Sequence, residues 1–213
     1  MAMKLPDPAL LLVTDRHQAQ LPLADVVRAA LAAGCRWVSV REKDLSDDDQ
    51  IALALTLLPI ARRYGARLTL HGDAVLAKAC DSDGVHLPAG SDPAASRALL
   101  GPDKLIGVSL HTVNEAEAID PSVDYAIAGP TFETPSKPGY GPEIGHKGLA
   151  EIAAVAPVPV LAIGGLNATR AAEVLAAGPV GIAVMGSIMR AVDPGQEVKA
   201  LLAIVAGAHP RAR

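Results

Sequence analysis

Aromatic residues are nearly missing from this chain of 213 residues, which has one Trp, three Tyr and one Phe although half of its residues are hydrophobic. Its core must therefore be built from Ala, Val, Leu and Ile, the residues that fill parallel strands covered on both faces. Cysteine is scarce as well: Cys35 and Cys80 lie far apart in sequence and have no metal-type spacing. We expect two buried thiols in a reducing, cytoplasmic compartment rather than a disulfide.

Clusters of Lys and Arg and long apolar runs are also missing. The net charge is −4, and without a basic stripe the chain is a poor fit for a nucleic-acid partner. No apolar run reaches the length of a membrane span, and residues 1–8 lack a signal-peptide pattern. We therefore expect neither a nucleic-acid nor a membrane partner, while the oligomeric state, a homodimer included, stays open.

Short β-rich runs alternate with Ala- and Leu-rich helical segments along the whole chain. The expected strands are 9–15, 37–42, 67–71, 84–87, 105–111, 125–132, 158–164 and 181–185. The expected helices are 23–33, 47–64, 74–80, 93–100, 113–119, 147–155, 168–177 and 195–206. Eight strand–helix units predict an α/β fold, a single (β/α)8 TIM barrel. No linker divides the chain, so we expect one domain over residues 1–213 with its core at about 9–206.

Several helix starts carry their own local signal. Thr112 and Glu115 have the spacing of a capping box, in which each side chain satisfies a backbone amide near the other. Asp92 is a suitable cap for the helix that follows it. These signals support helices that begin at 113 and 93.

Polar residues occupy the C-terminal ends of the expected strands, where barrels of this kind build their active sites. They are Thr14, Asp15, Arg16, Arg41, Glu42, Lys43, His71, Asp73, His86, Ser109 and His111. Strand ends are also exposed to solvent, and solvent exposure alone accounts for one or two polar residues there. It accounts less well for three histidines, an arginine and a lysine at one mouth, so we predict a polar site there.

Paired glycines follow the last two strands. Gly164 and Gly165 come after the seventh strand, and Gly186 and Ser187 come after the eighth. Barrels that bind phosphate commonly do so between these two loops, often beside a short extra helix, for which we expect residues 187–191. Glycine lets the backbone approach an anion closely. Two tight turns without a ligand are the plainer alternative.

A long loop rich in Gly and Pro spans residues 129–141. Thr134, Ser136 and Lys137 offer two hydroxyls and an ammonium within four residues, a suitable grip for phosphate oxygens. A hinged lid would bring them over the mouth. A disordered surface loop is an equal alternative on composition alone.

Six sequence segments follow one another in order between about residues 10 and 190: Val-Thr-Asp-Arg (13–16), Arg-Glu-Lys (41–43), Asp-Gly-Val-His-Leu (83–87), Gly-Val-Ser-Leu-His-Thr (107–112), Gly-Pro-Thr-Phe-Glu-Thr-Pro-Ser-Lys (129–137) and Ala-Ile-Gly-Gly-Leu (162–166). In these segments the sequence resembles the thiamine-phosphate synthase family, including its thiazole tautomerase branch. The resemblance implies a (β/α)8 barrel that joins a hydroxymethylpyrimidine diphosphate to a thiazole phosphate with Mg²⁺ and releases diphosphate. The implied partners are therefore small phosphorylated substrates.

The resemblance also implies roles for individual residues. Ser109, Thr134, Ser136 and Lys137 would hold phosphate groups, and Arg41 and Lys43 would face the diphosphate. The thiazole phosphate would be cradled by Gly164, Gly165, Gly186 and Ser187.

Three positions depart from the family's pattern. Ser39 stands where the family has the Gln that contacts the pyrimidine. The family's two metal-ligating Asp positions fall on Gly72 and Ser91, so Asp73 and Asp92, each one residue further along, could hold magnesium only if both loops rearrange.

These departures leave alternatives to the synthase. Residues 87–91 resemble the tautomerases, which shift a proton on the thiazole without a metal, yet Pro130 stands where those enzymes have their catalytic His. His71 could replace that base, or it could be a polar lining residue. A non-catalytic thiazole-phosphate or thiamine-phosphate binding protein is a further alternative. A zinc hydrolase built on His71, His86 and His111 is more remote. We take the synthase as the main prediction.

Overall fold

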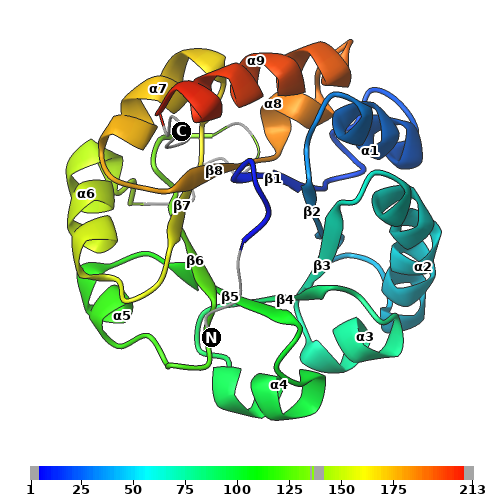
Figure 1. The fold of residues 1–213 in the computed structure, drawn as a ribbon, viewed down its shortest axis with the longest axis horizontal. Helices are drawn as coiled ribbons and strands as arrows, with labels where there is room; N and C mark the ends of the chain where they lie inside the picture. The colour runs from blue at the N-terminus through cyan, green and yellow to red at the C-terminus, as the bar shows by residue number, and fades with distance from the viewer. Residues whose placement is uncertain (1–4, 135, 137–141, 209–213) are drawn as a thin grey trace.

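Eight parallel strands form a closed barrel in chain order, as the strand–helix alternation predicts (Figure 1). The computed structural model describes residues 5–134, 136 and 142–208. The strands are β1 (Leu10–Val13), β2 (Trp37–Val40), β3 (Arg67–His71), β4 (Gly84–Leu87), β5 (Leu105–Leu110), β6 (Tyr125–Ala128), β7 (Val160–Ile163) and β8 (Gly181–Val184). Pairing of β1 with β8 closes the ring, since Leu11 lies opposite Ala183.

Helices form an outer layer around this ring (Figure 1). They are α1 (Leu23–Ala32), α2 (Asp47–Arg63), α3 (Ala74–Ala79), α4 (Pro93–Leu100), α5 (Val113–Glu117), α6 (Gly145–Val155), α7 (Ala168–Ala176), α8 (Gly186–Met189) and α9 (Pro194–Ala208). Within the described part of the chain, none of them is both long enough and apolar enough to cross a membrane.

The core has two layers because side chains alternate across each strand. Leu10 and Leu12 of β1 belong to the large cluster between strands and helices, whereas Leu11 belongs to a smaller cluster inside the barrel. Trp37 and Tyr125 meet inside the barrel edge to face, with ring centroids 4.6 Å apart. These two aromatic side chains fill part of the barrel interior, and Ala, Val, Leu and Ile make up most of the rest of the core.

Gly107 shows how tightly that interior is filled. A Cβ at this position of β5 would lie 2.1 Å from Cζ of Tyr125, a separation that real atoms do not tolerate. The Tyr125 ring therefore occupies the space that any other residue at 107 would need. Cys35 and Cys80 are both buried free thiols, as predicted.

The predicted elements exist, but several predicted ends are wrong. Strand β6 stops at Ala128 instead of residue 132, because Pro130 has no amide hydrogen to donate to a neighbouring strand. β1, β2 and β8 likewise end one or two residues earlier than predicted, before the polar residues of the mouth. The expected short helix after β8 is α8, which starts one residue earlier, at Gly186.

The predicted helix caps are confirmed. The Thr112 hydroxyl accepts a hydrogen bond from the Glu115 amide, and the Glu115 carboxylate accepts one from the Thr112 amide. Asp92 caps α4 by accepting from the Ala95 amide at 2.9 Å.

Candidate active site

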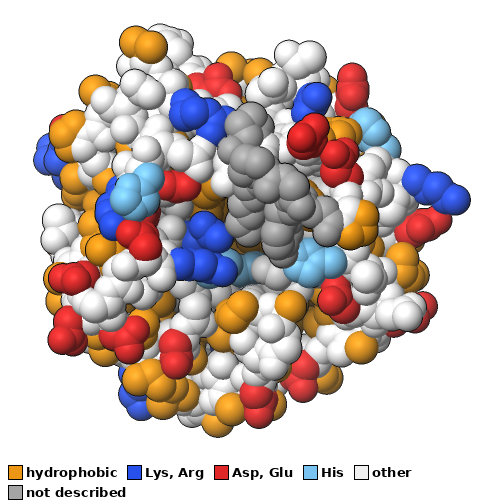
Figure 2. Space-filling view, turned by 180° about the vertical axis from the view of Figure 1, so that it is seen from behind, with side chains coloured by type: hydrophobic (Ala, Val, Ile, Leu, Met, Phe, Trp, Pro, Cys, Tyr) orange, Lys and Arg blue, Asp and Glu red, His pale blue; other side chains and the backbone are white. Residues whose placement is uncertain are grey.

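A cavity of about 390 Å³ opens at the C-terminal ends of the strands, a volume typical of small-molecule sites. Basic and histidine side chains lie near the centre of the face shown in Figure 2. The cavity is lined by most of the residues predicted to form the site: Ser39, Arg41, Lys43, His71, Ser109, Thr134, Ser136, Gly164, Gly165, Gly186 and Ser187. The structure therefore brings together residues from six strand ends that are distant in sequence. Lys137 lies outside the described residues and stays a prediction.

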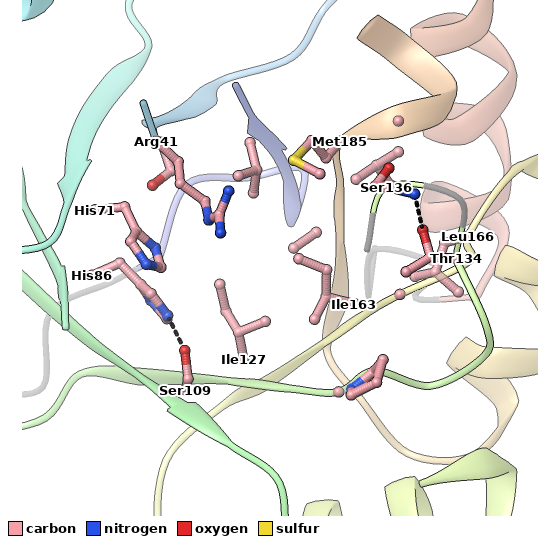
Figure 3. Close-up of a pocket in the computed structure, with 18 of the residues that line it drawn as sticks. Arg41, His71, His86, Ser109, Ile127, Thr134, Ser136, Ile163, Leu166 and Met185 are labelled. Carbon is pink, nitrogen blue, oxygen red and sulfur yellow. Dashed lines mark hydrogen bonds between the residues drawn. The ribbon is translucent and has the colours of Figure 1, made fainter. Parts of the chain in front are cut away.

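The two ends of this cavity differ in chemistry (Figure 3). Arg41, His71 and His86 lie on one side, and Thr134 and Ser136 lie on the other. Between them are apolar side chains, among them Ile127 and Ile163. We call the first side the cationic end, made of Arg41, Lys43, His71 and His86. The second is the hydroxyl end, made of Thr134, Ser136, Gly186 and Ser187.

Arg41 and Lys43 reach the cavity from the loop that follows β2. The buried Thr14 hydroxyl accepts a hydrogen bond from the Arg41 amide at 2.9 Å, which fixes the start of this loop against β1. Partial desolvation and then the neighbouring Arg41 charge lower the pKa of Lys43. Two cations side by side favour an anionic ligand, which would relieve their repulsion.

Glu42, the residue between these two cations, is turned away from the cavity. Its side chain is 1% exposed and is paired with Arg16 Nη1 at 3.0 Å. Both of its oxygens also accept from the Arg16 backbone amide at 3.1 Å. Arg16 in turn pairs with Asp44, which raises the pKa of Arg16 and lowers that of Asp44. Arg41 and Lys43 thus line the cavity, whereas the Glu42 carboxylate between them in sequence is paired with Arg16 outside it.

His86 is a neutral, buried member of the cationic end. Its Nε2 lies 3.0 Å from Ser109 Oγ, and its ring stacks on that of His71 with centroids 5.1 Å apart. Burial, and then the charges of Lys43 and Arg41, lower the pKa of His86 to about 3. His86 therefore stays uncharged near neutral pH and holds the Ser109 hydroxyl in place.

The hydroxyl end is shaped by close approach of the chain. Thr134 Oγ1 accepts from the Ser136 amide at 3.2 Å, and the buried Ser187 Oγ has no hydrogen-bond partner among the described residues. Gly164, with a φ of +106°, has no room for a side chain, because a Cβ there would lie 2.8 Å from Pro130 Cα. A ligand oxygen near Ser187 would satisfy that hydroxyl.

Sequence reasoning missed Gln18 and Arg190, which meet the hydroxyl end. Arg190 lines the cavity, and its Nη1 donates to Ser136 Oγ at 3.2 Å and to Gln18 Oε1. Ser136 Oγ also donates to Gln18 Oε1 at 2.9 Å. Arg190 follows Gly186 by four residues, the spacing that places two helical residues on one face. That spacing was the signal available for Arg190, whereas nothing local marks Gln18.

Asp73 and Asp92, the predicted metal ligands, do not line the cavity. Asp73 caps α3 by accepting from the Val75 amide at 2.7 Å, and Asp92 caps α4. The described residues hold no group of three His, Cys, Asp or Glu side chains arranged to bind a metal. The residues present therefore do not fit the magnesium ion that the resemblance implies. They do not fit the zinc hydrolase either, since the described residues His71, His86 and His111 form no such group.

The tautomerase alternative meets a similar difficulty. Pro130, where a catalytic His would be needed, lines the cavity but carries no proton. His71, the substitute considered for it, lies at the cationic end, across the cavity from Thr134 and Ser136 (Figure 3).

Comparisons with known proteins agree with the synthase. A family model described as thiamine monophosphate synthase matches residues 10–188. The thiamine-phosphate synthase of Roseiflexus sp. (strain RS-1) is 42% identical over 199 residues, which are 92% of this chain and 84% of that protein. The thiamine-phosphate synthase of Chlorobium luteolum is 37% identical over 201 residues, 93% of each chain.

The same family appears among solved structures. The thiamine phosphate pyrophosphorylase from Pyrococcus furiosus superposes with a TM-score of 0.83 at 31% identity, covering 93% of this chain and 96% of that one. The chain belongs to the thiamine-phosphate synthase family and is an enzyme of that type.

Proposed function

We propose that this enzyme joins hydroxymethylpyrimidine diphosphate to thiazole phosphate and releases diphosphate. The observation that carries the proposal is the two-ended cavity. A cationic end and a hydroxyl end are separated by apolar side chains, which suits two substrates that each bring a phosphorylated tail and an aromatic ring. Its volume of about 390 Å³ is sufficient for two small rings held face to face.

Thiazole phosphate is assigned to the hydroxyl end. Thr134, Ser136 and Ser187 supply hydroxyls, and Gly164, Gly165 and Gly186 line the cavity with backbone that carries no side chain, which an anion can approach. Arg190 adds a cation, since it can exchange its bond to Ser136 for one to a phosphate oxygen.

The diphosphate of the other substrate is assigned to Arg41 and Lys43, with Ser109 and the predicted Lys137 as further contacts. Ser39 is fully enclosed below them and is assigned to the pyrimidine ring. In the reaction, the bond between the pyrimidine methylene carbon and the diphosphate oxygen breaks, and the electron pair leaves with the diphosphate. The thiazole nitrogen then gives its lone pair to that carbon. The protein orients the two rings and neutralises the charge that develops on the leaving group.

Incubation with both substrates in a buffer that contains MgCl₂, followed by chromatography, tests the proposal. We expect thiamine phosphate and diphosphate to form in equal amounts. Arg41→Gln should lower kcat by about tenfold or more, because a charge-assisted contact to the leaving group is lost. Lys147→Gln is the matched control, since Lys147 lies on α6 with its side chain 91% exposed. Absence of thiamine phosphate from the wild-type reaction would refute the proposed function.

A further inference from the structure

We infer that the cationic end holds the diphosphate with Arg41 and Lys43 in place of a carboxylate-bound magnesium ion, so that the protein binds diphosphate without a divalent metal. The inference deepens the proposed coupling reaction and rests on it for the identity of the ligand. It concerns how the negative charge of that ligand is neutralised.

The first observation is the absence of a carboxylate from the cavity wall. None of the described lining residues is Asp or Glu. Positions 135 and 137–141, which complete the loop after β6, add neither residue type in sequence. Magnesium demands near-octahedral oxygen ligands and is held in proteins by one or two carboxylates together with phosphate oxygens. The polar groups on the cavity wall are instead cationic side chains, histidines and hydroxyls, which do not replace carboxylate ligands of magnesium.

The second observation is that four acids in the loops after β1, β2, β3 and β4 already have other partners. Asp15 accepts from the His17 amide at 3.1 Å. Glu42 is paired with Arg16 beneath the loop. The Asp73 and Asp92 carboxylates complete the first turns of their helices. To reach a metal in the cavity, either aspartate would have to leave a backbone amide without its cap, at a cost of about 1 kcal/mol.

The third observation is the backbone at Gly72, directly after β3. Its φ of +139° is one that residues with a side chain rarely adopt. The space around it is open, since a Cβ would meet nothing within 4 Å. The loop is therefore built around glycine by its conformation, and an aspartate could not be accommodated here without changing the path of the chain.

The fourth observation is the positive charge at the cationic end. Among the ion pairs of the described residues, none involves Lys43, and Arg41 is its cationic neighbour. A free Mg²⁺ ion would meet repulsion at this end. A diphosphate with several negative charges would instead be attracted, and an arginine fork can bind two of its oxygens at once.

Isothermal titration calorimetry with inorganic pyrophosphate tests the inference directly. We expect the wild-type protein in EDTA to bind pyrophosphate at least as tightly as in MgCl₂, since the metal lowers the charge of the ligand. Arg41→Gln and Lys43→Gln should each weaken binding in EDTA by about tenfold or more. Lys147→Gln should bind like the wild type, and melting curves should show that all three variants are folded. Pyrophosphate binding that requires MgCl₂, or that is unchanged in both cavity variants, would overturn the inference.

The coupling assay separates this inference from the function on which it rests. We expect thiamine phosphate to form in EDTA at a rate within about threefold of that in MgCl₂. Product in MgCl₂ alone would overturn the inference and leave the proposed function in place. No product in either buffer would overturn the proposed function, and the calorimetric comparison of EDTA with MgCl₂ would still decide how the cationic end binds an anion.

Discussion

Replacement of Gly186 by Ala should weaken phosphate binding at the hydroxyl end without unfolding the protein. Gly186 begins α8 directly after β8, and a Cβ here would lie 2.5 Å from Arg190 Nη2 and 2.6 Å from Ser136 Oγ. Both atoms are the ends of side chains, so they can move. The change therefore tests the space around the proposed phosphate site rather than the path of the backbone.

The size of the effect follows from these distances. Non-bonded heavy atoms rest at about 3.5 Å or more, so Arg190 and Ser136 must each retreat by about 1 Å. That movement breaks the hydrogen bond of 3.2 Å between them and withdraws both from the phosphate. Loss of one hydrogen bond to a charged group costs about 1.5–3 kcal/mol, which weakens binding by roughly 10- to 150-fold. Stability should change by less than about 1 kcal/mol, because alanine also favours a helix over glycine.

Calorimetric titration with thiazole phosphate and urea unfolding measure the two quantities. Gly207→Ala is the matched control, since Gly207 lies in α9 and a Cβ there would meet nothing within 4 Å. The control should bind thiazole phosphate like the wild type. If Gly186→Ala also kept the wild-type affinity while remaining folded, the assignment of phosphate to the hydroxyl end would be wrong.

Three further predictions concern other parts of the mouth. The pKa of buried His86, about 3 in the folded protein, lies below its unfolded value of about 6.5, so the unfolded state takes up the proton first and stability falls as the pH drops from about 6.5 toward 3. Urea unfolding at pH 7 and pH 5 should therefore show a loss about 2 kcal/mol smaller in His86→Gln than in the wild type; equal losses would contradict this. Glu42→Ala should lower the free energy of unfolding by about 3 kcal/mol. Asp44→Ala should lower it by less than about 1 kcal/mol, because the Asp44 side chain is 52% exposed. A larger loss in Asp44→Ala than in Glu42→Ala, measured by urea unfolding, would show that Glu42 does not hold the loop after β2 in place. The double variant Asp73→Asn/Asp92→Asn should keep its stability to within about 0.5 kcal/mol, since Asn caps helices as well as Asp, and should bind pyrophosphate like the wild type in calorimetry; a tenfold loss would place these carboxylates at the ligand.

The barrel was predictable because its signal is repeated. An apolar pattern and a turn predict each strand and each helix, and few topologies other than a barrel are compatible with eight strand–helix units. The ends of strands were not predictable to the residue. Whether a strand continues depends on hydrogen bonds to its neighbours, and Pro130 cannot donate one. The sequence around Pro130 nevertheless has an extended pattern, although β6 ends at Ala128.

The positions of the candidate site residues were predictable where a residue comes directly after a strand. Arg41, Ser109 and Gly186 each had a position fixed by the barrel itself. Gln18 was missed because its partner Arg190 is 172 residues away, and only the closed ring brings β1 beside β8.

That Asp73 and Asp92 do not line the cavity has a different reason. An aspartate after a strand can turn toward the mouth or back onto the helix that follows it, and both choices have the same sequence. Asp73 and Asp92 turn back, as their bonds to the amides of Val75 and Ala95 show.

In the proposed reaction, each end of the cavity would hold one phosphorylated group, and the charge of only one of these groups changes during the step. The thiazole keeps its phosphate throughout, so hydroxyls and close backbone approach at the hydroxyl end need only hold a charge that does not change. The diphosphate gains negative charge as its bond to carbon breaks, so attraction by full cations at the cationic end grows during the step. An interaction that strengthens toward the transition state raises kcat, whereas one that is constant only improves binding. Under the proposed function, we therefore expect Arg41 and Lys43 to contribute to the rate, and Gly186 and Ser187 to contribute to substrate affinity.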